Sequence, residues 1–334
     1  MNKNYGKVYG QAENLTDVLA DLSKYSVIQD YKLYAVFQSE GVYDSITDSK
    51  YFYYTYDNGY PVINLDPTLG NDLSGKITLP GKDPNGSYIE GIGLMTCHKV
   101  GSGLGGFRQD YVVNGTNITH VFFEKDNAYT YVEDYAFGNP DNNYANHKLV
   151  GVYLPDSIRE IGQYAFKSAF FLTDLTLNDN ITSIEQYAFN GYSNRKHGLV
   201  LTKLPAKLEF IGPYAFQDNN SKITELPSGL TSLPEYCFSR CENVRIDTFK
   251  SPLVSIGTRC FANSGSGVGP IDTIYLENTV TSLGSKCFLQ YGGGTGPSQI
   301  CTTRPLTDSA VSQWDASELT GNSQAAVSKW TAGK

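Results

Sequence analysis

The sequence predicts a mainly β protein with little helix, built as a solenoid in which one short unit stacks on the next. Two observations predict this fold class. The heptapeptide EIGQYAF at 160–166 returns as SIEQYAF at 183–189 and as FIGPYAF at 210–216. Ahead of such copies lie short runs with alternating apolar residues, most clearly LTDLTLNDN at 172–180. Alternation indicates a strand with one buried face, and a unit this small buries that face only against a neighbouring copy.

The phenylalanine that closes each copy defines the repeat and its expected core. Six copies place one aliphatic residue eight positions before this phenylalanine and a second five positions before it. Alanine or cysteine always precedes the ring, which lets neighbouring coils approach to strand spacing, about 4.8 Å. We therefore expect one continuous row of rings in the interior. These structural core residues are Phe137, Phe166, Phe189, Phe216, Phe238, Phe261 and Phe288.

Glycine and proline mark the ends of the expected strands. Proline follows a leucine in the LP pairs at 154–155, 204–205 and 226–227, where a ladder hydrogen bond is no longer needed. Glycine follows the second aliphatic residue in four copies, and we expect it to permit the turn. These glycines are at positions 162, 212, 257 and 284.

The motifs resemble the BspA-like, or Treponema-type, leucine-rich repeats, whose units run LPxxIxxIGxxAFxxC. The resemblance covers roughly residues 72–290, although the cysteine after AF survives only as Cys241 and the loop GNPDNNYANH at 138–147 is longer than usual. It implies a leucine-rich-repeat solenoid with a right-handed coil, a concave parallel sheet and small capping segments. Because members of the family are commonly surface adhesins, it also implies a role in recognition.

The chain divides into four expected segments. Residues 1–48 contain YKLYAVF, which is similar to the last strand of the internalin-type B repeat, so we expect a partial β-grasp-like segment there. Residues 49–90 form an N-terminal cap and opening turn, in which the aromatic run YFYYTY seals the first coil. The repeat solenoid occupies residues 91–300. Residues 301–334 form a C-terminal cap or tail, either as a short helix over the end or as a docking segment.

Composition excludes several classes of partner. The 26 Lys and Arg residues are outnumbered by 34 Asp and Glu, giving a net charge of −8, and a nucleic-acid partner would need a basic surface. No apolar run approaches the roughly 20 residues of a spanning helix, so we expect no membrane insertion. The first residues lack a secretory signal. A cytosolic protein, a processed fragment of a secreted protein and a virus-particle component all remain open.

No catalytic or metal-binding constellation is visible, so we expect neither an enzyme nor a cofactor. The lone C-x3-C at 237–241 has no second pair, which argues against zinc. Cysteines in the alanine position of the repeat are expected to be buried free thiols, with a disulfide ladder between coils as the minor alternative. These are Cys237, Cys260 and Cys287. Histidines are expected at the surface or in turns rather than as ligands: His98, His120, His147 and His197. Glycosylation at Asn114 or Asn180 is a minor possibility.

Binding is expected on the outer face of the strands. One residue per unit precedes the last apolar position of its strand and should face outward, and aromatics there indicate recognition or simply suit a half-exposed strand. The sequence therefore favours a non-enzymatic recognition or adhesion protein at a cell surface or outside the cell, binding a protein or glycan. The alternative is a structural virion component on the particle surface, such as a phage fibre, tail or decoration protein, attached through its terminal segments; an enzyme within residues 1–90 is disfavoured. The candidate binding residues are Phe122, Tyr153, Thr176, Lys203, Glu225, Thr248 and Tyr275.

Overall fold

The chain forms two compact units, residues 1–46 and 47–334. The computed structural model describes residues 46–66, 73–93, 117–138, 148–191, 197–250, 252–267, 269 and 271–331. The expected β-grasp-like segment lies outside these residues apart from 46–48. So do His98, His147, Cys97 and Asn114.

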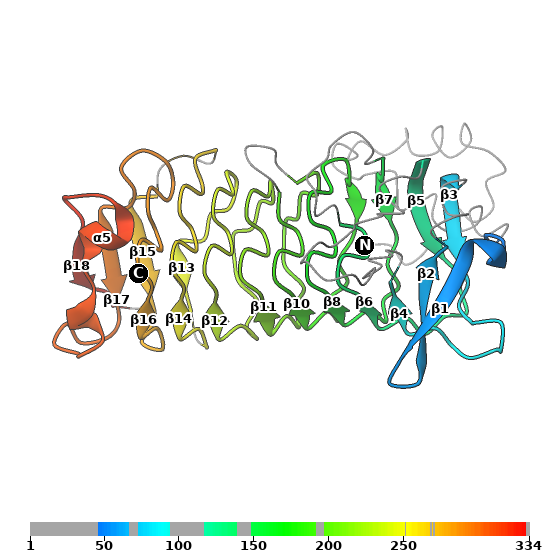
Figure 1. The fold of residues 1–334 in the computed structure, drawn as a ribbon. Helices are drawn as coiled ribbons and strands as arrows, with labels where there is room; N and C mark the ends of the chain where they lie inside the picture. Colours follow the sequence, from blue (N-terminus) through cyan, green and yellow to red (C-terminus); the bar gives the residue numbers. More distant parts are fainter. Residues whose placement is uncertain are drawn as a thin grey trace, which may run out of the picture. The chain divides into compact units, whose positions relative to one another are not determined.

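The second unit is a β-solenoid with two separate rows of strands along the stack of coils (Figure 1). The first row contains the antiparallel pair β1 (Phe52–Asp57) and β2 (Tyr60–Leu65) and continues with parallel two-residue strands. These are β4 (Gly91–Ile92), β6 (Tyr131–Val132), β8 (Glu160–Ile161), β10 (Ser183–Ile184) and β11 (Phe210–Ile211), then β12 (Ser232–Leu233), β14 (Ser255–Ile256) and β16 (Ser282–Leu283) as a separate sheet.

The second row consists of two parallel four-stranded sheets. The first comprises β3 (Ser74–Leu79), β5 (Asn117–Phe123), β7 (Gly151–Val152) and β9 (Asp174–Leu175). The other comprises β13 (Thr248–Phe249), β15 (Thr273–Leu276), β17 (Gln299–Thr302) and β18 (Ala326–Lys329). Among the described residues between β9 and β13, no strand belongs to this row.

The strands of the second row are the ones that the sequence predicts. The strands of the first row are not predicted by the sequence. The sequence places one strand in each unit, ahead of the aliphatic pair. In the structure the second aliphatic residue also lies in a strand, for example Ile161, which aligns with Ile184 of the next coil. Both side chains are fully buried. Where both rows have strands, neighbouring coils are therefore fastened to each other on two sides.

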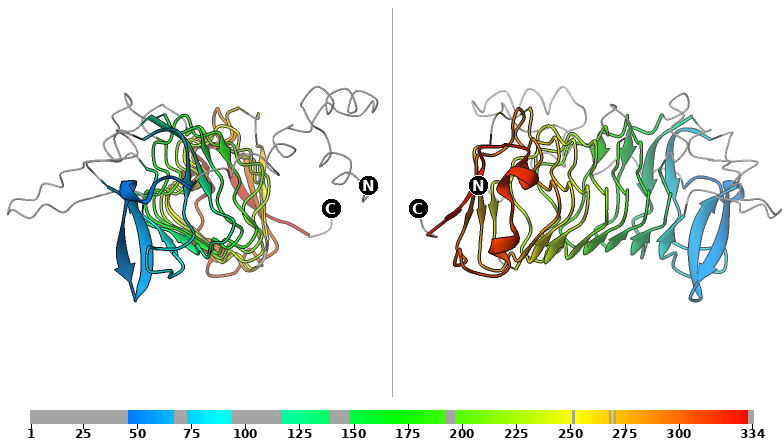
Figure 2. Two further views of the ribbon diagram at one scale, coloured as in Figure 1. Left: turned by 90° about the vertical axis from the view of Figure 1, so that its right-hand side faces the viewer. Right: turned by 60° about the vertical axis from the view of Figure 1, so that its left-hand side comes forward.

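The interior contains the row of rings that the repeat predicts. All seven phenylalanines are fully buried, and each ring stacks on the next with centroids 5.0 to 5.9 Å apart. Figure 2 shows the coils stacked along this axis. The row passes through one continuous core of buried residues rather than through separate cores.

The repeated glycines have a different role from the one expected. None of the four has a positive φ, so they do not supply a left-handed turn. They are instead places where the preceding coil approaches too closely for a side chain. A Cβ at Gly212 would lie 2.3 Å from the backbone nitrogen of Gln186, and one at Gly284 would lie 2.3 Å from that of Thr258.

Both ends of the solenoid are covered by non-repeating segments. The hairpin of β1 and β2 lies at the N-terminal end of the first row (Figure 1). At the other end, the short helix α5 (Ala316–Thr320) offers the carbonyl groups that a further coil would supply. The backbone nitrogen of Phe288 donates to Leu319 and that of Gln290 to Thr320, both at 2.9 Å. Strand β17 crosses the expected boundary at residue 300.

The structure confirms the expected buried cysteines and corrects the expected position of one histidine. Cys237, Cys260 and Cys287 are free thiols and fully buried, as the repeat predicts. His197 is not at the surface, because its side chain is fully buried. Its Nε2 lies 2.7 Å from the carbonyl oxygen of Phe166, and its Nδ1 accepts a hydrogen bond from Leu199.

Candidate functional site

The expected binding row has aromatic residues near each end. Phe122 and Tyr153 stack on the outer face of the second row, with centroids 4.5 Å apart and planes 6° apart. Phe122 is nevertheless only 8% exposed, so the expectation that it is accessible is wrong. The stacked ring of Tyr153 covers it. Tyr153 and Tyr275 are half-buried, and Tyr275 lies 5.2 Å from Trp330 between ring centroids.

The middle of the same row is polar and interrupted. Lys203 and Glu225 are exposed but lie where the second row has no described strand. The Nζ of Lys203 is 2.9 Å from the carboxylate of Asp179, so this lysine is already paired within the chain. Thr176 is exposed, and Thr248 is half-buried. The structure therefore does not unite the seven candidates into one aromatic surface.

A more regular surface feature is a tyrosine ladder that sequence reasoning missed. It lies in the turns that follow β6, β8, β10, β11 and β12. Adjacent rings are 4.7 to 5.0 Å apart between centroids, and their planes differ by 7 to 14°. All members are half-buried, outside the phenylalanine core. The tyrosine ladder consists of Tyr135, Tyr164, Tyr187, Tyr214 and Tyr236.

The backbone of the ladder residues has an uncommon conformation. Each of the five tyrosines has φ between +54° and +64°, a backbone region that residues other than glycine seldom adopt. The conformation points each backbone N–H at the next coil, as when Tyr164 donates to the carbonyl of Gln186 at 3.0 Å. Positive φ costs about 1–2 kcal/mol. Each stacked ring pair contributes about 0.5–1.5 kcal/mol, which is an offset of the same order.

Cations border the tyrosine ladder. The Nζ of Lys167 lies 5.3 Å from the ring centroid of Tyr164 and 5.7 Å from that of Tyr187. Desolvation, and then the neighbouring tyrosines, raises the pKa of Tyr187 to about 12, so its hydroxyl keeps its proton at neutral pH. A sequence signal for the ladder does exist, since tyrosine stands two residues before five of the seven repeat phenylalanines.

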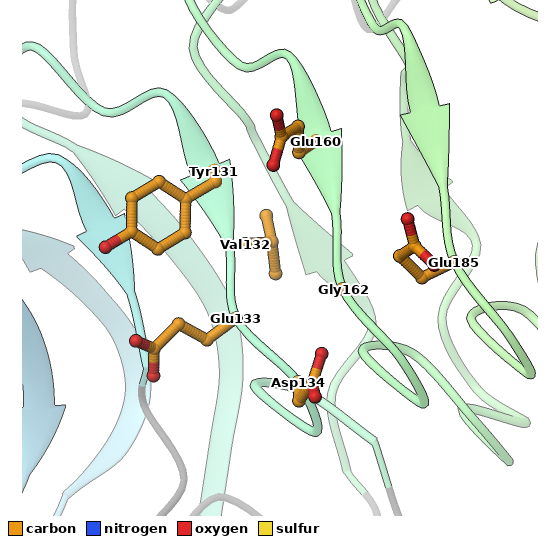
Figure 3. A pocket seen from close by; sticks show the side chains of 7 residues that line it. All are labelled: Tyr131, Val132, Glu133, Asp134, Glu160, Gly162 and Glu185. Atoms are coloured by element: carbon orange, nitrogen blue, oxygen red, sulfur yellow. The ribbon is translucent and has the colours of Figure 1, made fainter. Parts of the chain in front are cut away.

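A groove of about 430 Å³ is lined by residues in and next to β6, β8 and β10 of the first row (Figure 3). The ring of Tyr131 covers Gly91, because a Cβ there would lie only 2.6 Å from the ring. Desolvation raises the pKa of Glu133, and the charges of Asp57 and Asp134 add to the shift. The groove is therefore an acidic surface with one aromatic ring. Its lining residues are Tyr131, Val132, Glu133, Asp134, Glu160, Gly162 and Glu185.

Two carboxylates of the groove accept hydrogen bonds from within the chain. Asp134 accepts from the backbone nitrogen of Gln163 at 2.7 Å, and Glu185 accepts from the hydroxyl of Ser183 at 2.7 Å. Within the described part of the chain, no group of three or more His, Cys, Asp and Glu is arranged to hold a metal ion. The helices described there are all too short to cross a membrane.

Comparison with known proteins gives one family and several distant structures. The family described as "BspA type Leucine rich repeat region" matches residues 108–202 and 196–292, in six copies. The leucine-rich repeat protein TpLRR of T. pallidum is 19% identical, with a TM-score of 0.46, over 75% of this chain and 91% of that one. A leucine-rich repeat protein from Bacteroides ovatus is 17% identical, with a TM-score of 0.41, over 86% and 67%. A leucine-rich cell surface protein from Faecalibacterium prausnitzii is 15% identical, with a TM-score of 0.34, over 86% and 95%. No curated protein matches the chain.

Proposed function

Because the chain belongs to the BspA-type leucine-rich repeat family, we propose that it is a non-enzymatic recognition and adhesion protein. It presents the outside of a rigid solenoid to a protein or glycan on a host or cell surface. Its place is at the cell surface or outside the cell. The repeat coils supply the scaffold, and the side chains on their outer faces supply the contacts.

One observation carries the proposal: aromatic rings stand in rows outside a core that is already filled. The phenylalanine spine and its aliphatic neighbours account for the interior. The tyrosine ladder, Tyr153 and Tyr275 lie beyond it and are half-buried. Tyrosine is enriched at binding hot spots because it contributes a large contact area and a hydrogen-bonding hydroxyl. Stacking also gives the ladder rings a role in the fold, and their hydroxyl groups are chemically suited to contacts with a partner.

Binding of the full chain to protein and glycan arrays, and to cells, tests the proposal. We expect measurable binding that falls at least tenfold in the double variant Tyr153→Ala plus Tyr275→Ala. The matched control is Phe171→Ala, which removes an aromatic ring that is 48% exposed but outside the rows. Equal binding by the double variant would exclude these two rings as contacts. Absence of binding to every surface would refute the recognition role.

Localisation is tested separately. Fractionation of cells and of particles from the source organism should recover the chain with the cell surface or the medium. Recovery with purified virus particles would instead favour the virion component that the sequence left open.

A further inference from the structure

The tyrosine ladder continues beyond its last tyrosine as a column of seven rungs. Arg259 and Lys286 occupy the same place in the next two coils, with φ values of +51° and +55°. The backbone nitrogen of Arg259 donates to the following coil, to Ser285, as those of the tyrosines do. The guanidinium of Arg259 lies 5.9 Å from the ring centroid of Tyr236, so the cation closes the stack.

The column is electrically polar along its length. Its last two rungs are basic, and its first rung, Tyr135, is preceded by the exposed carboxylate of Asp134. Arg259, Lys286 and Asp134 form no ion pair with another residue in the described part of the chain. Asp134 accepts a hydrogen bond from the backbone nitrogen of Gln163, the residue before the second rung, so its charge lies beside that rung. Desolvation, and then this charge, raises the pKa of Tyr164. Lys167 places a cation beside the second and third rungs, so the charge complementarity rests on the outermost rungs, with Asp134 at one end of the column and Lys286 at the other.

The chemistry that the ladder exposes limits the kind of partner. Each inner ring is stacked on both sides, so its faces are covered and only ring edges and hydroxyl ends remain available. A hydroxyl both donates and accepts hydrogen bonds, which makes a row of phenols complementary to another such row. The rungs repeat at 4.7 to 5.0 Å, and a partner that meets every rung needs the same repeat. A second copy of this chain has that repeat.

We propose that the column is a self-association surface, at which two copies of the chain pack antiparallel about a two-fold axis through the fourth rung, Tyr214. In this arrangement the first rung of one copy faces the seventh rung of the other, so Asp134 meets Lys286. The second rung faces the sixth, so Tyr164 meets Arg259. Because the interface is isologous, each of these contacts is made twice.

The contact is small, so the association is weak. Seven rungs at strand spacing extend for about 30 Å, and a strip two or three side chains wide buries on the order of 1,000 Å² in total, the low end for specific complexes. A weak dimer of this kind doubles the valency of a surface protein without a new ligand contact. The inference goes beyond the proposed function, since a chain that binds no external ligand can still form the dimer.

Sedimentation velocity of the full chain over about 10 to 500 µM tests the proposal. We expect a concentration-dependent dimer that weakens as salt rises. The double variant Arg259→Glu plus Lys286→Glu should dimerise at least tenfold more weakly, and Asp134→Lys should do the same, because each places like charges opposite each other. The control Lys222→Glu plus Lys250→Glu changes the same number of exposed charges outside the column and should dimerise like the unmodified chain.

Mixing the two disruptive variants gives the decisive result. In an equal mixture, the new glutamates of one chain face the new lysine of the other, while the reciprocal contact is unmodified. We expect the mixture to recover the dimer although each variant alone is largely monomeric. Recovery also excludes misfolding, since misfolded chains would not restore a specific pair. A monomeric unmodified chain, a dimer indifferent to both variants, or a mixture that stays monomeric would each overturn the proposal.

A second set of variants tests the hydroxyls without disturbing the stack. Tyr187→Phe plus Tyr236→Phe keeps both rings and removes two phenol groups that face each other in the proposed dimer. We expect weaker dimerisation with unchanged circular dichroism. Unchanged dimerisation would show that the hydroxyl row is not part of the interface and would refute the proposed packing.

Discussion

Replacing Phe189 by alanine tests the physical basis of the fold. The side chain is fully buried near the middle of the phenylalanine row. Its ring stacks on Phe166 at 5.2 Å and on Phe216 at 5.5 Å, and its edge meets His197 at 5.9 Å. Removing it leaves a cavity between coils that two hydrogen-bonded neighbours hold open. We expect a loss of about 3–5 kcal/mol in the free energy of unfolding, the usual range for a buried Phe→Ala change.

The Phe189→Ala change should also alter the shape of the urea unfolding curve. A solenoid is stabilised by contacts between neighbouring repeats, so a weak coil in the middle separates the two halves energetically. Urea unfolding followed by circular dichroism should show a lower midpoint and a smaller slope m, because less surface unfolds in each step. Hydrogen exchange resolved along the chain locates the break at residues near 189.

The matched control is Phe210→Ala, the same chemical change on the outer face of the first row. Phe210 is 46% exposed, so its removal opens no cavity and should cost no more than about 1 kcal/mol. The comparison keeps the residue type constant and varies only burial. If Phe189→Ala destabilises the chain no more than Phe210→Ala, the ring stack does not carry the stability that we attribute to it.

Two further predictions concern the close approach of coils and the acidic groove. Gly212→Ala places a methyl group 2.3 Å from the backbone of Gln186, so we expect a loss of about 1–3 kcal/mol or more in urea unfolding. Gly267→Ala should cost less, because its nearest neighbour is the movable side chain of Asn243 at 2.8 Å and the nearest backbone atom, the oxygen of Glu242, is 3.1 Å away. Equal losses would contradict the proximity argument. Desolvation raises the pKa of Glu133 in the folded chain, so ionisation of this carboxyl opposes folding. The free energy of unfolding therefore increases as pH falls from above the folded pKa of Glu133 toward its unfolded pKa. Glu133→Gln should therefore raise the thermal midpoint at pH 7 and raise it less near pH 4; a larger gain at the acidic pH would refute the assigned cause.

The core could be predicted from sequence because it is periodic and chemically uniform. A phenylalanine with alanine or cysteine before it, and with aliphatics five and eight residues earlier, has one simple explanation in a stacked fold. The two-residue strands of the first row could not be recognised by alternation, which needs a longer run. Ile161 was therefore expected only as an aliphatic core residue after the strand, although it aligns with Ile184 in a parallel ladder.

The outer surface was less predictable because it depends on contacts between coils. Alternation correctly places Phe122 and Tyr153 on an outer face, but it does not show that one ring covers the other. The lack of a metal-ligand pattern around His197 led to the expectation of a surface or turn position, whereas the carbonyl of Phe166 and the amide of Leu199 satisfy its ring nitrogens in the interior. Leu199 is two residues from His197, but Phe166 is 31 residues away, so the sequence alone does not show the second contact.

The tyrosine ladder shows why the repeat keeps a strained position instead of removing it. Glycine at Tyr164 or Tyr187 would relieve the positive φ, and glycine tolerates that conformation at no steric cost. It would also remove two ring stacks, each of which contributes about 0.5–1.5 kcal/mol. The backbone conformation is fixed independently by N–H bonds to the next coil, so it persists whichever side chain is present. Tyrosine in five successive coils thus stabilises a turn that the hydrogen bonds already impose, and the same turn holds the phenol groups in a row outside the core.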